Sequence, residues 1–186
     1  MIVRLLLSLL LLAPLPVLAV EVEGVQLPDR LEVQGETLHH NGHGIRKKLF
    51  FDIYIGSLYT ATPVHSLSEA LASPGAKLIR MDFLYKKVEK EKIIEAFREG
   101  LANQSTALAA GEEAQAFLAW FGQDFVRGDQ VELELGGDGT VTARHNGELL
   151  GTLRSPTFAE AVLGIYLGDK PADARLKAGM LQGKER

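Results

Sequence analysis

Hydrophobic and polar positions alternate along the first third of the chain, a period typical of β-strands. Short alternating stretches at 21–25 and 31–34 are separated by turn residues, and a denser one begins at residue 49. One face of this third stretch is strictly apolar and consists of Leu49, Phe51, Ile53 and Ile55. The other face is mixed and consists of Phe50, Asp52, Tyr54 and Gly56. Because the mixed face keeps aromatic side chains, we expect it to contact helices or a ligand rather than open water.

Helical periods enter further along, and strands return after them. We predict helices over 66–72, 86–101, 112–121, 156–167 and 171–181, and strands over 77–85, 131–135, 141–143 and 149–153. Ser66 and Glu69 form a helix-capping pattern, and Asn146-Gly147 indicates a tight hairpin. This order predicts an α+β fold, with a large antiparallel sheet covered by helices on one face. Without repeats or linkers, residues 20–186 are predicted to form a single domain.

The N-terminus is typical of a secretory signal peptide. Residues 5–18 form an apolar run after Arg4, and Val17-Leu18-Ala19 matches a signal-peptidase site. The run is shorter than the roughly 20 residues that a membrane span needs. We therefore expect residues 1–19 to be cleaved, which leaves a periplasmic or secreted protein without a membrane span. The chain has no cysteine, so neither a lipid anchor on cysteine nor a disulfide is available.

Composition and charge exclude several classes of function. The net charge is −4, and acidic and basic residues are interspersed, which disfavours nucleic acid as a partner. Without cysteine there are no thiolate zinc sites, iron–sulfur clusters or cysteine nucleophiles. His39, His40 and His43 are interpreted as polar residues flanking an Asn41-Gly42 turn rather than as metal ligands, because neighbours on a strand point to opposite faces. We predict no metal and no cofactor.

Arg46 and Tyr54 admit two interpretations. They are either a surface arginine with an ordinary sheet tyrosine, or a pair of donors that bind one carboxylate or oxyanion. On an uninterrupted strand, eight residues would separate them by about 26 Å. The pair can therefore share a ligand only if the chain turns or bulges between Arg46 and Leu49.

Three segments resemble the chalcone isomerase-like family, and more narrowly its bacterial secreted branch. They are NGHGIRKK at 41–48, DIYIGSLY at 52–59 and AVLGIYLGD at 161–169. The resemblance implies an open-faced β-sandwich with a ligand cleft between sheet and helices. It also implies a role for Arg46, because the matching arginine holds an oxyanion in plant isomerases and a carboxylate in fatty-acid-binding members. Tyr54 matches the tyrosine that assists this arginine in the fatty-acid binders.

The chain departs from the isomerases where their other catalytic residues lie. They carry a tyrosine and an asparagine on the helix after the central strand, where this sequence has Lys92 and Glu99, and Ile165 replaces a threonine of the late helix. Whether the protein is an enzyme therefore stays open.

Our leading hypothesis is a non-catalytic periplasmic protein that binds a small amphipathic anion such as a fatty acid. Its predicted ligand-binding residues are Arg46 and Tyr54 for the head group, and Phe50, Phe83, Phe97 and Tyr166 for the apolar part. The alternatives are an isomerase or intramolecular lyase acting on an enone-like substrate, and a structural cell-envelope protein without a ligand.

Overall fold

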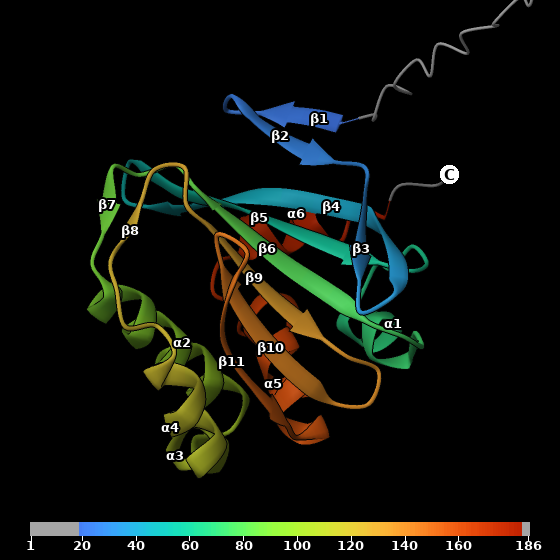
Figure 1. Cartoon of the computed structure of the whole chain (residues 1–186), viewed down its shortest axis with the longest axis vertical. Coiled ribbons are helices and arrows are strands. Elements are labelled where there is room, and N and C mark those ends of the chain that lie inside the picture. The colour runs from blue at the N-terminus through green and yellow to red at the C-terminus, as the bar shows by residue number, and fades with distance from the viewer. Residues whose placement is uncertain (1–18, 184–186) are drawn as a thin grey trace, which may run out of the picture.

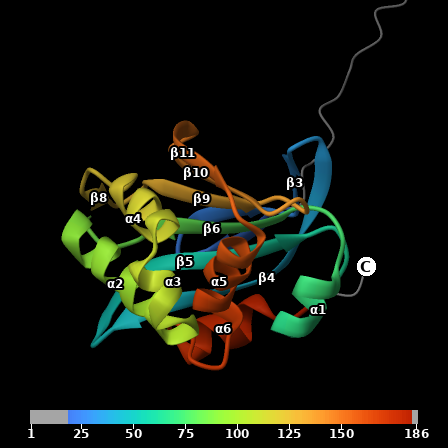
Figure 2. The same ribbon diagram turned by 90° about the horizontal axis from the view of Figure 1, so that it is seen from below.

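The computed structural model describes residues 19–183, so the predicted signal peptide lies outside it but for Ala19. Within this range the chain forms one large antiparallel sheet of seven strands, in the order β11-β10-β9-β6-β5-β4-β3. Helices cover one face of this sheet, and the β1–β2 hairpin lies on the other side (Figure 1, Figure 2). The α+β prediction is confirmed.

The elements follow one another in the predicted order. The strands are β1 (Ala19–Val22), β2 (Val25–Pro28), β3 (Arg30–Val33), β4 (Glu36–Lys48), β5 (Phe51–Thr60), β6 (Lys77–Phe83), β7 (Lys87–Val88), β8 (Phe125–Val126), β9 (Gln130–Leu135), β10 (Thr140–His145) and β11 (Glu148–Arg154). The helices are α1 (Leu67–Ala72), α2 (Lys90–Gln104), α3 (Thr106–Ala110), α4 (Glu112–Ala119), α5 (Pro156–Leu167) and α6 (Ala174–Met180). Strand β2, the long strand β4, the short strands β7 and β8, and helix α3 were not predicted from the sequence.

The core lies between the sheet and the helices. Alternate side chains of the central strands point to this side, and they include Leu58 on β5, Met81 on β6 and Leu133 on β9. Helix α5 is the centre of the helical layer, because nine of its twelve residues are buried. A helix that is apolar all round belongs in the interior, which explains why the sequence of α5 lacks a polar face. No helix of residues 19–183 is long and apolar enough to cross a bilayer.

One predicted turn is absent. Asn41-Gly42 lies inside β4, where the pairing with β5 shifts register between His40 and Gly42 as in a β-bulge. Glycine is needed here because α6 lies directly on the strand. A Cβ atom on Gly44 would come within 2.8 Å of the Cα atom of Leu176, and one on Gly42 would meet the carbonyl oxygens of α6. The two glycines therefore serve close packing rather than a turn.

Asn41 fixes α6 and the loop after β5 to this strand. It is 3% exposed, and its Nδ2 donates to the carbonyl oxygens of Val64 at 2.9 Å and Met180 at 2.8 Å. Its Oδ1 accepts from the backbone N–H of Val64 at 2.8 Å. One buried amide thus satisfies three backbone groups, which belong to two residues far apart in the sequence.

We expect Asn41→Ala to lower the free energy of unfolding by about 3 kcal/mol, because each buried backbone group left without a partner costs about 1–3 kcal/mol. Urea denaturation measures this loss. The control is Asn103→Ala, which removes an exposed amide from α2 and should change stability by no more than about 0.5 kcal/mol. Equal stability of the two variants would show that Asn41 does not tie these segments together.

Candidate functional site

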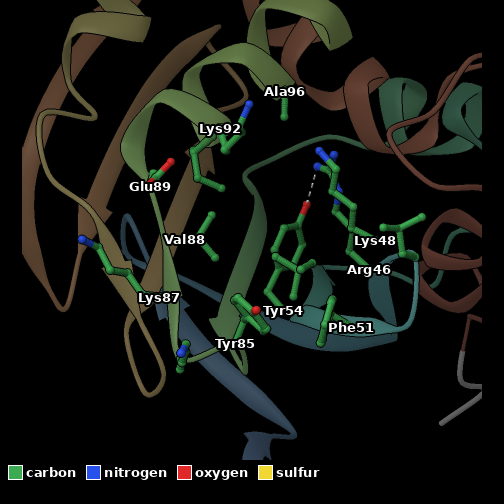
Figure 3. A pocket seen from close by; sticks show the side chains of 14 residues that line it. Arg46, Lys48, Phe51, Tyr54, Tyr85, Lys87, Val88, Glu89, Lys92 and Ala96 are labelled. Atoms are coloured by element: carbon green, nitrogen blue, oxygen red, sulfur yellow. Dashed lines mark hydrogen bonds between the residues drawn. The ribbon is translucent and has the colours of Figure 1, made fainter.

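The β4–β5 hairpin brings Arg46 and Tyr54 together. The chain turns at Leu49-Phe50, and the register shifts between Arg46 and Lys47, so that Arg46 lies directly opposite Tyr54 in the ladder. Arg46 Nη1 donates to Tyr54 Oη at 3.4 Å, and its guanidinium carbon lies 5.8 Å from the centre of the ring. Figure 3 shows both side chains directed into the same pocket. The condition that the sequence set for a shared ligand is therefore met.

The charge of Arg46 is not neutralised by a neighbouring carboxylate. The side chain is half-buried, and none of the salt bridges formed within residues 19–183 includes it. Its pKa is raised mainly by the Tyr54 hydroxyl, against the opposing effect of burial, while Asp173 contributes less. A guanidinium presents several N–H donors in a planar fork, which suits a carboxylate. The site thus holds a fixed positive charge with donors to spare.

Tyr166 lies beneath this pair, in the core. Its hydroxyl donates to Met81 Sδ at 3.2 Å, and the ring is 1% exposed. Burial raises the pKa of Tyr166 well above its ordinary value; Tyr54 adds to this rise, and the charge of Arg46 opposes it. Tyr166 is therefore a neutral phenol at neutral pH, and it supports Tyr54 from below.

A pocket of about 500 Å³ opens above Arg46 and Tyr54, between the β4–β5 hairpin and the beginning of α2 (Figure 3). Its size is within the range of small-molecule sites. The apolar and aromatic lining residues are Leu49, Phe51, Ile53, Tyr54, Tyr85, Val88, Ile93 and Ala96. The charged lining residues are Arg46, Lys48, Lys86, Lys87, Lys92 and Glu89. An apolar wall with five cations and one carboxylate suits an amphipathic anion.

The four aromatic residues predicted to line the apolar part do not line this pocket. Phe50 is 96% exposed at the tip of the hairpin, because the turn falls at Leu49-Phe50 and not before it. Phe83 stacks on Phe125 with ring centres 4.9 Å apart, and Phe97 packs 4.8 Å from Phe121. These two rings and that of Tyr166 are enclosed by neighbouring side chains in the core between the sheet and the helices.

Several residues of the pocket were not predicted. Phe51 and Tyr85 pack with ring centres 5.2 Å apart, and Val88 and Ile93 form the wall on the helix side. A signal for this wall was present in the sequence, since Val88 and Ile93 both belong to the apolar stripe of the helix predicted over 86–101. The pattern shows that α2 has an apolar stripe, but it does not show which end of the stripe is left uncovered.

Of the three positions that distinguish this chain from the isomerases, one lies at the pocket and two lie away from it. Lys92 lines the pocket and pairs with Glu95 at 3.2 Å, whereas Glu99 is on the exposed face of α2. Ile165 is 2% exposed and packs against Gly100, which closes the contact between α2 and α5. Neither Glu99 nor Ile165 belongs to the pocket wall.

The three histidines lie within β4 rather than around a turn, which corrects the sequence interpretation. His40 and His43 stack with ring centres 5.2 Å apart. Over residues 19–183 no group of three His, Asp or Glu side chains is arranged to hold a metal ion.

Comparison with known proteins identifies the family and the fold of the chain. The sequence profile of the family described as chalcone isomerase-like matches residues 19–182. No curated protein sequence matches the chain. The crystal structure of an Arabidopsis thaliana fatty-acid binding protein has the same fold, with a TM-score of 0.70 at 18% identity over 88% of this chain and 96% of that one. Since the profile spans nearly the whole chain, the protein belongs to the chalcone isomerase-like family.

Proposed function

We propose that the protein binds a fatty acid, or a similar amphipathic anion, in the pocket between the β4–β5 hairpin and α2. The observation that carries this proposal is the guanidinium of Arg46, which lies half-buried against Tyr54 without a carboxylate partner. A buried charge is costly unless it is paired, so an anion that enters the pocket relieves a cost already present in the free protein.

The two parts of the ligand would meet different surfaces. The carboxylate accepts hydrogen bonds from Arg46 and from the hydroxyl of Tyr54, and bonds to charged groups contribute about 1.5–3 kcal/mol. The tail lies along Ile53, Val88 and Ile93, where each buried CH₂ contributes about 0.8 kcal/mol. The tail therefore supplies most of the affinity, and the head group fixes the orientation.

Binding without catalysis is the form of this proposal that the site favours. An isomerase needs polar groups that orient the substrate and a water beside the oxyanion holder. At the three positions that differ from the isomerases, only Lys92 reaches the pocket, and its ammonium pairs with Glu95. The open pocket argues against a cleft filled by side chains. The shared fold with a fatty-acid binding protein also supports the proposal.

We propose further that the protein works in the periplasm. The basic start, the apolar run at 5–18 and the small residue Ala19 support export, and the absence of cysteine fits an oxidising compartment.

Arg46→Gln should weaken the binding of a long-chain fatty acid by about 10–100-fold, because it removes a charged hydrogen bond worth about 1.5–3 kcal/mol. Displacement of a fluorescent fatty acid from the purified protein measures this change. A fatty alcohol of the same length is the matched ligand, and its affinity should be nearly equal for both proteins because it has no negative charge.

Lys92→Gln is the control for charge alone, since Lys92 lines the same pocket but pairs with Glu95. It should weaken fatty-acid binding by less than Arg46→Gln does. The head-group assignment is wrong if Arg46→Gln binds the acid as tightly as the original protein, or if it weakens the alcohol and the acid equally.

Tyr54→Phe should weaken fatty-acid binding by about 2–10-fold, because a neutral hydrogen bond contributes about 0.5–1.5 kcal/mol. The ring is 2% exposed and its packing is kept by phenylalanine, so the urea midpoint should stay nearly constant. Unchanged affinity together with an unchanged midpoint would remove Tyr54 from the site.

Protein isolated from cells should begin at Val20, the residue after the predicted cleavage site. N-terminal sequencing of the protein released by osmotic shock tests this directly. A chain that still starts at Met1 and stays in the cytoplasmic fraction would contradict the periplasmic assignment.

A further inference from the structure

Four hairpins in residues 19–183 have a two-residue loop, and one of them differs from the rest. The loops between β1 and β2, β3 and β4, and β10 and β11 each consist of a polar residue and a glycine, namely Glu23-Gly24, Gln34-Gly35 and Asn146-Gly147. All six residues have positive φ angles, which is the geometry that such a loop favours. The loop between β4 and β5 is Leu49-Phe50.

Leucine is out of place at this position by the rules of turn chemistry. Leu49 has a φ of 57°, in the left-handed region that glycine, asparagine and aspartate tolerate best. Its side chain is also 83% exposed, so packing against the rest of the protein does not explain it. A backbone cost and an exposed apolar surface are thus accepted at the same residue, which points to a function for the side chain.

The tip carries a concentrated apolar surface. Six large hydrophobic side chains of residues 19–183 are exposed, and three of them are the consecutive residues Leu49, Phe50 and Phe51. Phe50 is the most exposed of all, at 96%. Phe51 packs on Tyr85, which holds the base of the tip in place. Single exposed apolar residues are ordinary, but a contiguous group on a protruding hairpin marks an interaction site.

Basic side chains gather on the side of this tip that faces the pocket, although the whole chain is acidic and Glu23 and Asp52 lie on its other side. The net charge of the chain is −4, yet five cations and a single carboxylate line the pocket beside the tip. Lys48 and Lys86 are exposed, and neither forms a salt bridge with another described residue. Apolar side chains beside basic ones suit a lipid bilayer, which has an apolar interior and, with anionic lipids, negatively charged head groups.

We propose that the β4–β5 hairpin is a membrane-docking element, which inserts Leu49 and Phe50 into the interface of a bilayer containing anionic lipids. Lys48 and Lys86 then contact the lipid head groups. Leu49 and Phe51 also line the pocket, so docking would place the mouth of the pocket against the bilayer. This surface does not depend on what the pocket binds, and the inference goes beyond the proposed function.

Vesicle co-sedimentation of the purified protein tests the proposal. Binding is expected to vesicles of phosphatidylcholine mixed with phosphatidylglycerol, with much weaker binding to phosphatidylcholine alone. Raising the salt from ~0.05 M to ~0.5 M should reduce binding, because the contribution of the lysines is screened.

Phe50→Ser should weaken partitioning at least about tenfold, since it removes one fully inserted aromatic side chain. Phe50→Trp should retain it.

Two pairs of variants separate docking from general effects. Leu49→Asn should lose vesicle binding while the urea midpoint stays equal or rises, because asparagine tolerates the left-handed backbone. The matched change Leu71→Asn, on α1 at the opposite end of β5, should leave binding unchanged. Lys48→Glu should weaken vesicle binding. Its control is Arg30→Glu, which makes the same change of charge far from the tip, opposite His39 in the sheet, and which should have little effect.

The expected results differ from those of the fatty-acid experiment. Phe50 does not line the pocket, so Phe50→Ser should keep its fatty-acid affinity while it loses vesicle binding. Vesicle binding that is absent, that ignores lipid charge, or that survives in Phe50→Ser would overturn the docking proposal. A dimer in light scattering that Phe50→Ser dissociates, without vesicle binding, would also overturn it and assign the tip to a second copy of the chain.

Discussion

A half-buried positive charge without a carboxylate partner is the constraint on which the rest of this account depends. Arg46 lies against Tyr54, with Tyr166 below and an apolar pocket above. Burial removes part of the hydration shell of the guanidinium. No salt bridge within residues 19–183 compensates for this loss. This is why we propose an anionic ligand, and the apolar side chains that line the pocket suit an anion with an apolar part.

The scaffold keeps this charge in place. The guanidinium belongs to a long β4–β5 hairpin whose far end is fixed to α6 by Asn41 and by the close approach of Gly42 and Gly44. Tyr54 in turn rests on the same core as Phe83, with ring centres 5.6 Å apart. The hairpin is thus anchored to α6 around Asn41, while its tip at Leu49-Phe50 is exposed. Arg46 and Tyr54 lie between the anchored part of the hairpin and the exposed apolar side chains at its end.

Much of the fold could be predicted from local signals. The cap at Ser66, the apolar helix over 156–167 and the Asn146-Gly147 turn each depend on neighbouring residues, and the structure contains all three. Asn41-Gly42 carries the same turn signal as Asn146-Gly147, but α6 packs there and the strand continues. A contact with a helix more than a hundred residues away decides between the two outcomes, and no local pattern records it.

The site was predicted in part, for a similar reason. Arg46 and Tyr54 stood out as a possible pair of donors, and a family resemblance favoured that interpretation, but their pairing needed a turn that the sequence could only state as a condition. Phe50 was assigned to the wrong surroundings because Leu49-Phe50 has no glycine or asparagine to mark a turn. Phe83 and Phe97 have the expected inward orientation, but periodicity gives the direction of a side chain and not whether a pocket or another ring faces it.

A crystal structure of the protein with a bound long-chain fatty acid tests the central claim most directly. The account predicts a carboxylate within hydrogen-bonding distance of Arg46 and Tyr54, with the tail along Val88 and Ile93. A carboxylate held by the exposed lysines, with the tail outside this pocket, would contradict it, as would an empty pocket at a saturating concentration of the acid.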